Sequence, residues 1–146
     1  MDNKPKLAQN SKGDPMHFSA GAVIEIDGKY LLIDRDMEPF GFAGLAGHIN
    51  EGETPEETLF RKVNEESGLK IKKYTLLFEE EVEWNWCRVE IQSHYWYLYR
   101  CEVEGKLQNN PEASKSIGWY STSEMKKLKW EPVWKYWFEK LGVLEK

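Results

Sequence analysis

Two adjacent glutamates, Glu65 and Glu66, are the side chains in this sequence best suited to hold a divalent cation. They lie in a segment with a helical pattern, and at about 100° per residue positions 62, 65 and 66 project from one narrow face. Carboxylate oxygens are hard ligands that suit Mg²⁺ or Mn²⁺, which keep part of their water shell when bound. We therefore expect a magnesium or manganese site on this helix.

The helix that carries these acids has clear signals at both ends. Thr54 can cap its first turn, Pro55 suits its first position, and Glu57, three residues after the cap, completes a capping box. Gly68 is typical of the residue at which a helix stops. The spacing thus predicts a helix from Pro55 to just before Gly68, entered from a glycine-containing turn.

The segment 47–69 resembles the Nudix signature, written G, five residues, E, seven residues, R-E-U-x-E-E-x-G-U, with U a bulky apolar residue. The residues that match are Gly47, Glu53, Arg61, Val63, Glu65, Glu66, Gly68 and Leu69. From average residue usage, a chance match in a chain of this size is below about one in ten thousand. One position departs from the pattern, because Lys62 stands where the signature has a glutamate.

The resemblance implies a metal site and a set of supporting residues. Glu65 and Glu66 would be metal ligands, joined by the backbone carbonyl of Gly47. Arg61 and Glu53 would form a supporting pair, with Gly68 also supporting the site and Arg61 counted with the catalytic residues.

A late loop completes the expected site. In related proteins a remaining ligand or general base often comes from a glutamate in such a loop, and Glu112 is the candidate here. The implied catalytic set is therefore Glu65, Glu66, Arg61 and Glu112.

The chemistry implied is hydrolysis of a diphosphate linkage, as in a nucleoside triphosphate or another nucleoside diphosphate derivative. The phosphate oxygens repel an attacking water, so divalent cations are needed to neutralise them. Lys62 replaces a carboxylate by a cation, which either weakens the metal site or contacts substrate phosphate directly. Arg35 is a second candidate phosphate contact. The alternative is a weak or inactive module that binds a nucleotide or an RNA end.

The remaining elements fit one layered domain. Residues 1–15 are predicted to be a flexible polar tail and residues 16–146 a single domain. Strand patterns cover 20–26, 29–34, 74–84, 88–101 and 116–121, and helical patterns cover 123–128 and 130–141. This order predicts a mixed sheet between helices, and the resemblance implies the Nudix-type α/β/α sandwich. Asp27-Gly28 predicts a two-residue hairpin turn, and the last helix should bury its tryptophans.

Aromatic side chains around the central strands are candidates to stack on a base. Trp84, Trp86, Trp96, Tyr95 and Tyr97 lie on or between these strands. Strand alternation places Tyr95 and Tyr97 on one face and Trp96 on the other, so they cannot all line one pocket.

Composition narrows the classes of partner. The net charge of −5 argues against a protein that binds nucleic-acid backbones by bulk electrostatics, and no apolar run has the length of a membrane span. We expect a cytoplasmic monomer or homodimer that takes a small nucleotide-type substrate. Cys87 and Cys101 show no ligand spacing, which favours two reduced thiols over a disulfide or zinc site, and His48 is given no catalytic role.

Overall fold

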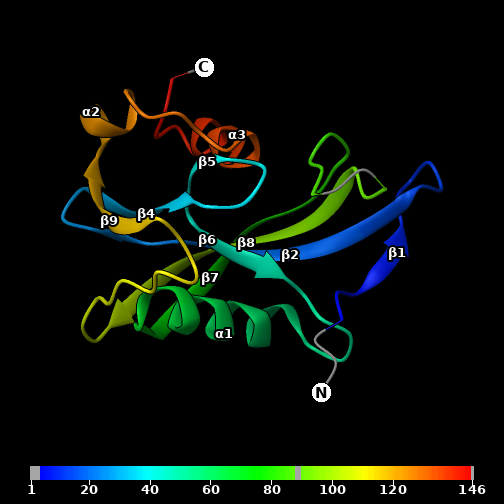
Figure 1. Cartoon of the computed structure of the whole chain (residues 1–146), viewed down its shortest axis with the longest axis horizontal. Coiled ribbons are helices and arrows are strands. Elements are labelled where there is room, and N and C mark those ends of the chain that lie inside the picture. The colour runs from blue at the N-terminus through cyan, green and yellow to red at the C-terminus, as the bar shows by residue number, and fades with distance from the viewer. Residues whose placement is uncertain (1–3, 88–89, 146) are drawn as a thin grey trace.

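The helices enclose a central mixed sheet in the computed structural model, which describes residues 4–87 and 90–145. Figure 1 shows helix α1 (Pro55–Ser67) on one side of the central strands and helix α3 (Pro132–Lys140) on the other. The predicted α/β class with a sheet between helices is confirmed. Within the described residues, no helix combines the length and apolar character that a membrane crossing requires.

The larger sheet supplies the platform for the candidate site. Its strands are β1 (Leu7–Gln9), β2 (Pro15–Val23), β8 (Ser93–Glu104) and β7 (Lys70–Val82) in that order, with β6 (Leu45–His48) also paired to β2. Strands β2 and β8 run parallel, whereas the other pairs are antiparallel. The sheet is therefore mixed, and β2 is the strand that pairs with both β6 and β8.

A second, antiparallel sheet packs beside the first. It contains β3 (Glu25–Ile26), β4 (Lys29–Arg35), β5 (Gly41–Ala43) and β9 (Ser116–Ser121). Strands β3 and β4 form the predicted hairpin, because Asp27 and Gly28 adopt φ values of 53° and 79°, as a two-residue turn of this kind requires. Strand β4 ends at Arg35 and so delivers that side chain to the edge of the site.

The C-terminal helices close the core, as the aromatic spacing predicts. Helix α2 (Thr122–Met125) is short, and α3 buries Trp134 and Trp137, which are 2% and 0% exposed. Glu131 caps α3 by accepting a hydrogen bond from the backbone of Trp134, and Pro132 occupies the first turn. The tryptophans thus belong mainly to the core.

Two predicted boundaries need correction. Residues 4–15 are not a loose tail, because β1 pairs with the start of β2 and the Lys6 amide donates to the carbonyl of Ile49. The predicted strand 88–101 begins at Ser93, while positions 88 and 89 lie outside the described residues. The chain before Ser93 instead forms a longer connection, in which the Cys87 amide donates to the carbonyl of Ile91.

Candidate active site

Helix α1 fixes the acidic side chains, and its ends are built as the sequence predicts. The Thr54 side chain accepts from the Glu57 amide, and the Glu57 side chain accepts from the Thr54 amide. The helix stops at Gly68, whose φ is 74°. A Cβ atom at this position would lie about 3.0 Å from Cδ of Gln108. The backbone that carries the acids therefore begins and ends at defined residues.

A bidentate ion pair joins α1 to the turn before it. Arg61 Nε and Nη2 each donate to the Glu53 carboxylate at 2.9 Å. Glu53 Oε1 also accepts from the Asn50 amide at 3.0 Å and from the Thr58 hydroxyl at 2.9 Å. The Arg61 guanidinium is the main reason that the pKa of Glu53 falls to about 2. Glu53 therefore stays ionised and holds the turn against the helix.

Glu66 and Glu65 differ sharply in their surroundings. Glu66 is 6% exposed, and its Oε1 accepts from the Ala46 amide on β6 at 3.2 Å. Burial raises the pKa of Glu66 to about 7. Glu65 is 48% exposed at its side chain and lies 3.5 Å from both Arg61 Nη1 and Lys62 Nζ. One carboxyl is thus buried against β6, and the other is held between two cations.

Lys62 lies among these acids instead of turning into solvent. Its aliphatic stem packs over Gly47, where a Cβ atom would come within 2.5 Å of the lysine Cδ and Cε. The Lys62 charge also opposes the effect of burial on the pKa of Glu66. A glycine at position 47 is required for this approach, because any side chain there would displace the lysine stem. The Lys62 stem therefore covers Gly47, while its ammonium lies near Glu65 on the same face of α1.

A cavity of about 260 Å³ opens beside this face. Its lining includes Gly47, Lys62 and Glu66. Arg35 also lines the cavity, and its Nε donates a hydrogen bond to the carbonyl of Pro39 at 2.7 Å. Other lining residues include Asp36, His48, Asn85, Trp86, Cys87, His94, Trp96, Ala113, Glu131 and Trp134. The cavity thus brings basic, acidic and aromatic groups together.

Glu112 does not line this cavity. It is exposed, and the neighbouring Ala113 lines the wall in its place. The loop is nonetheless tied to α1, because Asn110 Nδ2 donates to the carbonyl of Glu65 at 3.0 Å and Asn110 Oδ1 accepts from the Glu112 amide at 3.1 Å. The structure therefore places the expected loop beside α1, with Glu112 exposed and outside the cavity lining.

The aromatic residues divide between the cavity and other surfaces. Trp86 and Trp96 line the cavity, whereas Tyr95 donates its hydroxyl hydrogen bond to Glu79 at 2.9 Å. Trp84 is 49% exposed and packs edge-on against Tyr136. Trp86, which is 40% exposed, is therefore the better placed aromatic for contact with a base.

A buried carboxyl that the sequence analysis did not identify also faces the cavity. Glu131 is 4% exposed, and burial raises its pKa to about 7, with Arg35 opposing the rise. Its sequence signal is the acid immediately before Pro132, which is typical of a helix N-cap. That signal predicts a cap, and only the packing of α3 on β5 shows that the carboxyl also reaches the cavity.

The three histidines and Cys87 form a second group that sequence spacing did not reveal. His17, His48, Cys87 and His94 each offer a ligand atom, and these atoms all lie within 4.8 Å of one another. Among the described residues, this is the only such convergence of three or more His, Cys, Asp or Glu ligand atoms. Burial is the main cause that lowers the pKa of His48 to about 3 and of His94 to about 4. Both rings are therefore neutral near pH 7.

Comparison of the chain with models of known protein families identifies its family. The model of the NUDIX domain matches residues 15–141, which include strands β2 to β9 and helices α1 to α3. The chain belongs to the Nudix family. The predicted resemblance is thus confirmed, and Lys62 is a departure within a genuine Nudix domain.

Relatives and solved structures agree with this membership. An ADP-ribose pyrophosphatase from Methanocaldococcus jannaschii is 46% identical over 57 residues, which cover 38% of this chain and 34% of that enzyme. The match therefore spans about a third of the relative's length. A Nudix hydrolase from Nitrosomonas europaea has a TM-score of 0.70 at 20% identity, covering 86% of this chain and 88% of that chain. A MutT Nudix hydrolase from Burkholderia pseudomallei has a TM-score of 0.66 at 22% identity, covering 75% and 85%. These structures show the shared fold.

Proposed function

We propose that this Nudix protein is a divalent-metal-dependent hydrolase that cleaves the diphosphate linkage of a nucleoside diphosphate derivative. The observation that carries the proposal is a cavity lined by Gly47, Lys62 and Glu66, next to a helix that the Glu53–Arg61 pair braces. The cavity also presents the Arg35 and Lys62 side chains, whose charges suit phosphate oxygens.

The donor set fits Mg²⁺ or Mn²⁺. Two carboxylates and the carbonyl of Gly47 are hard oxygen ligands, and an ion of this kind fills its remaining positions with water or phosphate. When bound, such an ion would neutralise phosphate oxygens and make a bound water more acidic. Lys62 stands in this donor set in place of a third carboxylate, so we propose that the site holds fewer ions than a full acidic signature.

The chain's own residues then supply binding and proton transfer. Lys62 and Arg35 bind the phosphate groups, while Trp86 offers a surface on which a base can stack. Glu131 is the candidate general base, since it lines the cavity, has a pKa near 7 and, unlike Glu66, is not assigned to the metal. We propose it for this role in place of Glu112, which is exposed and outside the cavity lining.

The test is an activity screen with a paired substitution. Purified protein is incubated with Mg²⁺ or Mn²⁺ and either ADP-ribose, a nucleoside triphosphate or another nucleoside diphosphate derivative, and phosphate-containing products are measured. ADP-ribose comes first because the Methanocaldococcus jannaschii relative is named an ADP-ribose pyrophosphatase. We expect turnover by the wild type and a loss of at least about a hundredfold in Glu66→Gln.

The matched control is Glu102→Gln, which removes the same charge from an exposed position on β8 and should keep full activity. A protein that releases no product with any substrate, yet binds a nucleotide tightly, would contradict the hydrolase. That result would favour the binding module, in which Lys62 replaces the catalytic ion instead of assisting it.

A further inference from the structure

Every histidine in the chain meets at one place, together with one of the two cysteines. His17 and His94 are directly opposite one another on the parallel strands β2 and β8. His48 is opposite Ser19, which is two residues from His17 on β2, so its side chain projects from the same face of the sheet. Cys87 approaches that face from the connection between β7 and β8. Four separate segments therefore converge on one point.

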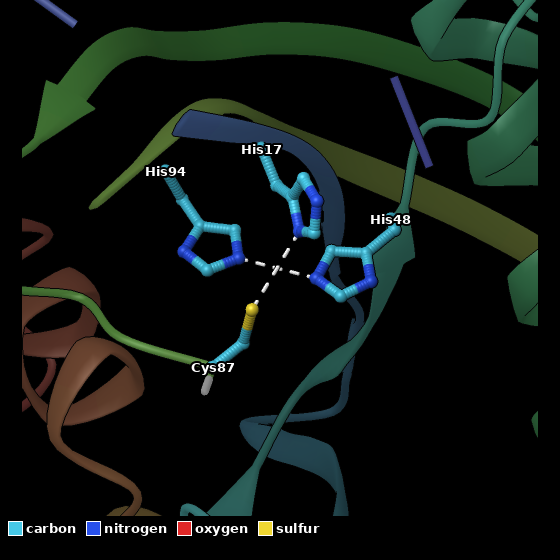
Figure 2. A group of neighbouring side chains, drawn as sticks. All are labelled: His17, His48, Cys87 and His94. Atoms are coloured by element: carbon cyan, nitrogen blue, oxygen red, sulfur yellow. Dashed lines mark hydrogen bonds between the residues drawn. The ribbon is translucent and has the colours of Figure 1, made fainter. Parts of the chain in front are cut away.

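Two of the distances between ligand atoms in the group are close to those of a tetrahedral metal site, and all of them are within 4.8 Å. His48 Nε2 lies 3.1 Å from His94 Nε2, and Cys87 Sγ lies 3.6 Å from His17 Nδ1. Around zinc, with bonds of about 2.0 to 2.3 Å, tetrahedral ligand atoms are roughly 3.3 to 3.7 Å apart. The two measured pairs share no residue, so they correspond to opposite edges of a tetrahedron. Figure 2 shows the four side chains pointing toward one another, with the two contacts crossing in that view.

His94 is already oriented as a metal ligand. Its Nδ1 lies 2.6 Å from the backbone carbonyl of Asn85, and a carbonyl only accepts, so Nδ1 carries the hydrogen. The other ring nitrogen, Nε2, then presents its lone pair to the group. Asn85 is itself buried and fixed, because its side-chain oxygen accepts from Trp96 Nε1 at 2.7 Å. This chain of contacts holds the ring in the tautomer that ligation requires.

The donor set selects a different kind of ion from the carboxylates of α1. Three imidazoles and a thiolate are borderline-soft ligands typical of Zn²⁺, whereas Glu65 and Glu66 are hard oxygen donors. Without an ion, one hydrogen between His48 and His94 and the Cys87 thiol hydrogen toward His17 would satisfy the same contacts. The hydrogen-bonded group and the metal-bound group therefore differ in whether they bind Zn²⁺, which a metal titration measures.

We propose that His17, His48, Cys87 and His94 form a four-coordinate site for Zn²⁺, separate from the magnesium-type site on α1. Four protein ligands leave no open position, which is characteristic of a structural zinc site. His48, Cys87 and His94 also line the cavity, next to Asn85 and Trp86. Zinc would therefore fasten the connection after β7 to the sheet and fix the wall that carries Trp86.

The experiment uses metal alone as the probe, so its outcome does not depend on hydrolase activity. The full chain is freed of metal with a chelator under reducing conditions, then titrated with Zn²⁺ or with Co²⁺ as a spectroscopic substitute. We expect one Zn²⁺ per chain. With Co²⁺ we expect visible bands of a tetrahedral site and a near-ultraviolet band from sulfur-to-metal charge transfer.

Two substitutions and a matched control assign the ligands. Cys87→Ser should abolish the charge-transfer band and weaken Zn²⁺ binding by at least about tenfold, and His48→Gln should weaken it similarly while keeping the band at saturation. Cys101→Ser removes the other cysteine, buried in β8, and should change neither. Circular dichroism confirms that each variant is folded.

Two results would overturn the proposal. The first is a folded, reduced wild type that binds no Zn²⁺. The second is Zn²⁺ binding that is equally tight in Cys87→Ser and His48→Gln, which would place the ion on other groups. As a further measure, Zn²⁺ should slow hydrogen exchange at residues 84–87 by at least about tenfold in the wild type and leave it unchanged in Cys87→Ser.

Discussion

Lys62 provides the sharpest test of the reasoning about the acidic face of α1. Its Nζ lies 3.5 Å from Glu65 Oε2. An ion held by that oxygen at about 2.1 Å would lie within about 5.6 Å of the ammonium, by adding the two lengths. If the lysine stays where it is, the ammonium therefore opposes binding of any divalent cation by Glu65.

The size of this opposition follows from Coulomb's law. At about 5.6 Å, a unit charge and a divalent ion repel by about 1.5 kcal/mol in bulk water and about 6 kcal/mol at an effective dielectric of about 20. The smaller value already corresponds to roughly tenfold in affinity. We therefore expect Lys62→Met, which removes one charge, to bind Mg²⁺ at least about tenfold more tightly. Lys62→Glu, which changes the charge by two units, should gain about a hundredfold.

Calorimetric titration at fixed ionic strength measures these affinities. Mg²⁺ is the appropriate ion because it prefers oxygen ligands and binds only weakly to the histidine and cysteine group. Lys135→Glu makes the same charge change at an exposed position on α3, on the opposite side of the sheet, and should leave the affinity unchanged within about twofold. Equal Mg²⁺ affinity in wild type, Lys62→Met and Lys62→Glu would refute the reasoning. It would mean that the ammonium swings away or that Glu65 is not a ligand.

Two further predictions concern carboxyls whose pKa shifts have opposite signs. The folded pKa of Glu53 is lowered from 4.5 to about 2, so its stabilisation is complete above pH 4.5 and is lost as the pH falls toward 2. Glu53→Gln should lower the free energy of unfolding by about 1–2 kcal/mol at pH 7, after allowance for solvent screening, and the difference should vanish near pH 2 in urea titrations. The folded pKa of Glu131 is raised from 4.5 to about 7, so the wild type should lose stability relative to Glu131→Gln as the pH rises from 4.5 to 7, by about 2–3 kcal/mol. A constant difference across that range would show that Glu131 is not buried as a carboxyl.

Local sequence signals account for the parts of the site that one segment builds alone. The capping box at Thr54 and the stop at Gly68 lie within a short stretch of chain, so spacing and side-chain type determine them. The Glu53–Arg61 pair is implied by the resemblance to the Nudix signature. The hairpin at Asp27 is equally local. Such features are predictable because their energetics depend on neighbours in sequence.

The remaining parts depend on strand register and on packing between distant segments. The histidine group requires that β2 pair with β8 in parallel and with β6 on its other edge, and no spacing within the sequence encodes either register. Glu131 reaches the cavity only because α3 packs on β5. The position of Lys62 depends on the absence of a side chain at Gly47, a contact across 15 positions of sequence. Sequence alone gives the charge of Lys62 and leaves its direction open.

The two proposed metal sites differ in chemistry, and this difference changes how metal dependence should be tested. A strong chelator would remove both a hard ion from Glu65 and Glu66 and a softer ion from the histidine and cysteine group. Loss of activity on chelation therefore does not by itself identify a catalytic magnesium site. Because Mg²⁺ has little affinity for thiolate and imidazole, re-addition of Mg²⁺ alone restores only the oxygen site. We expect activity to return fully only when Zn²⁺ is supplied together with Mg²⁺. In Cys87→Ser, part of the activity should be lost and the remainder should no longer depend on Zn²⁺. Together these results would mean that Zn²⁺ must hold the cavity wall that carries Trp86 in place before substrate can bind productively.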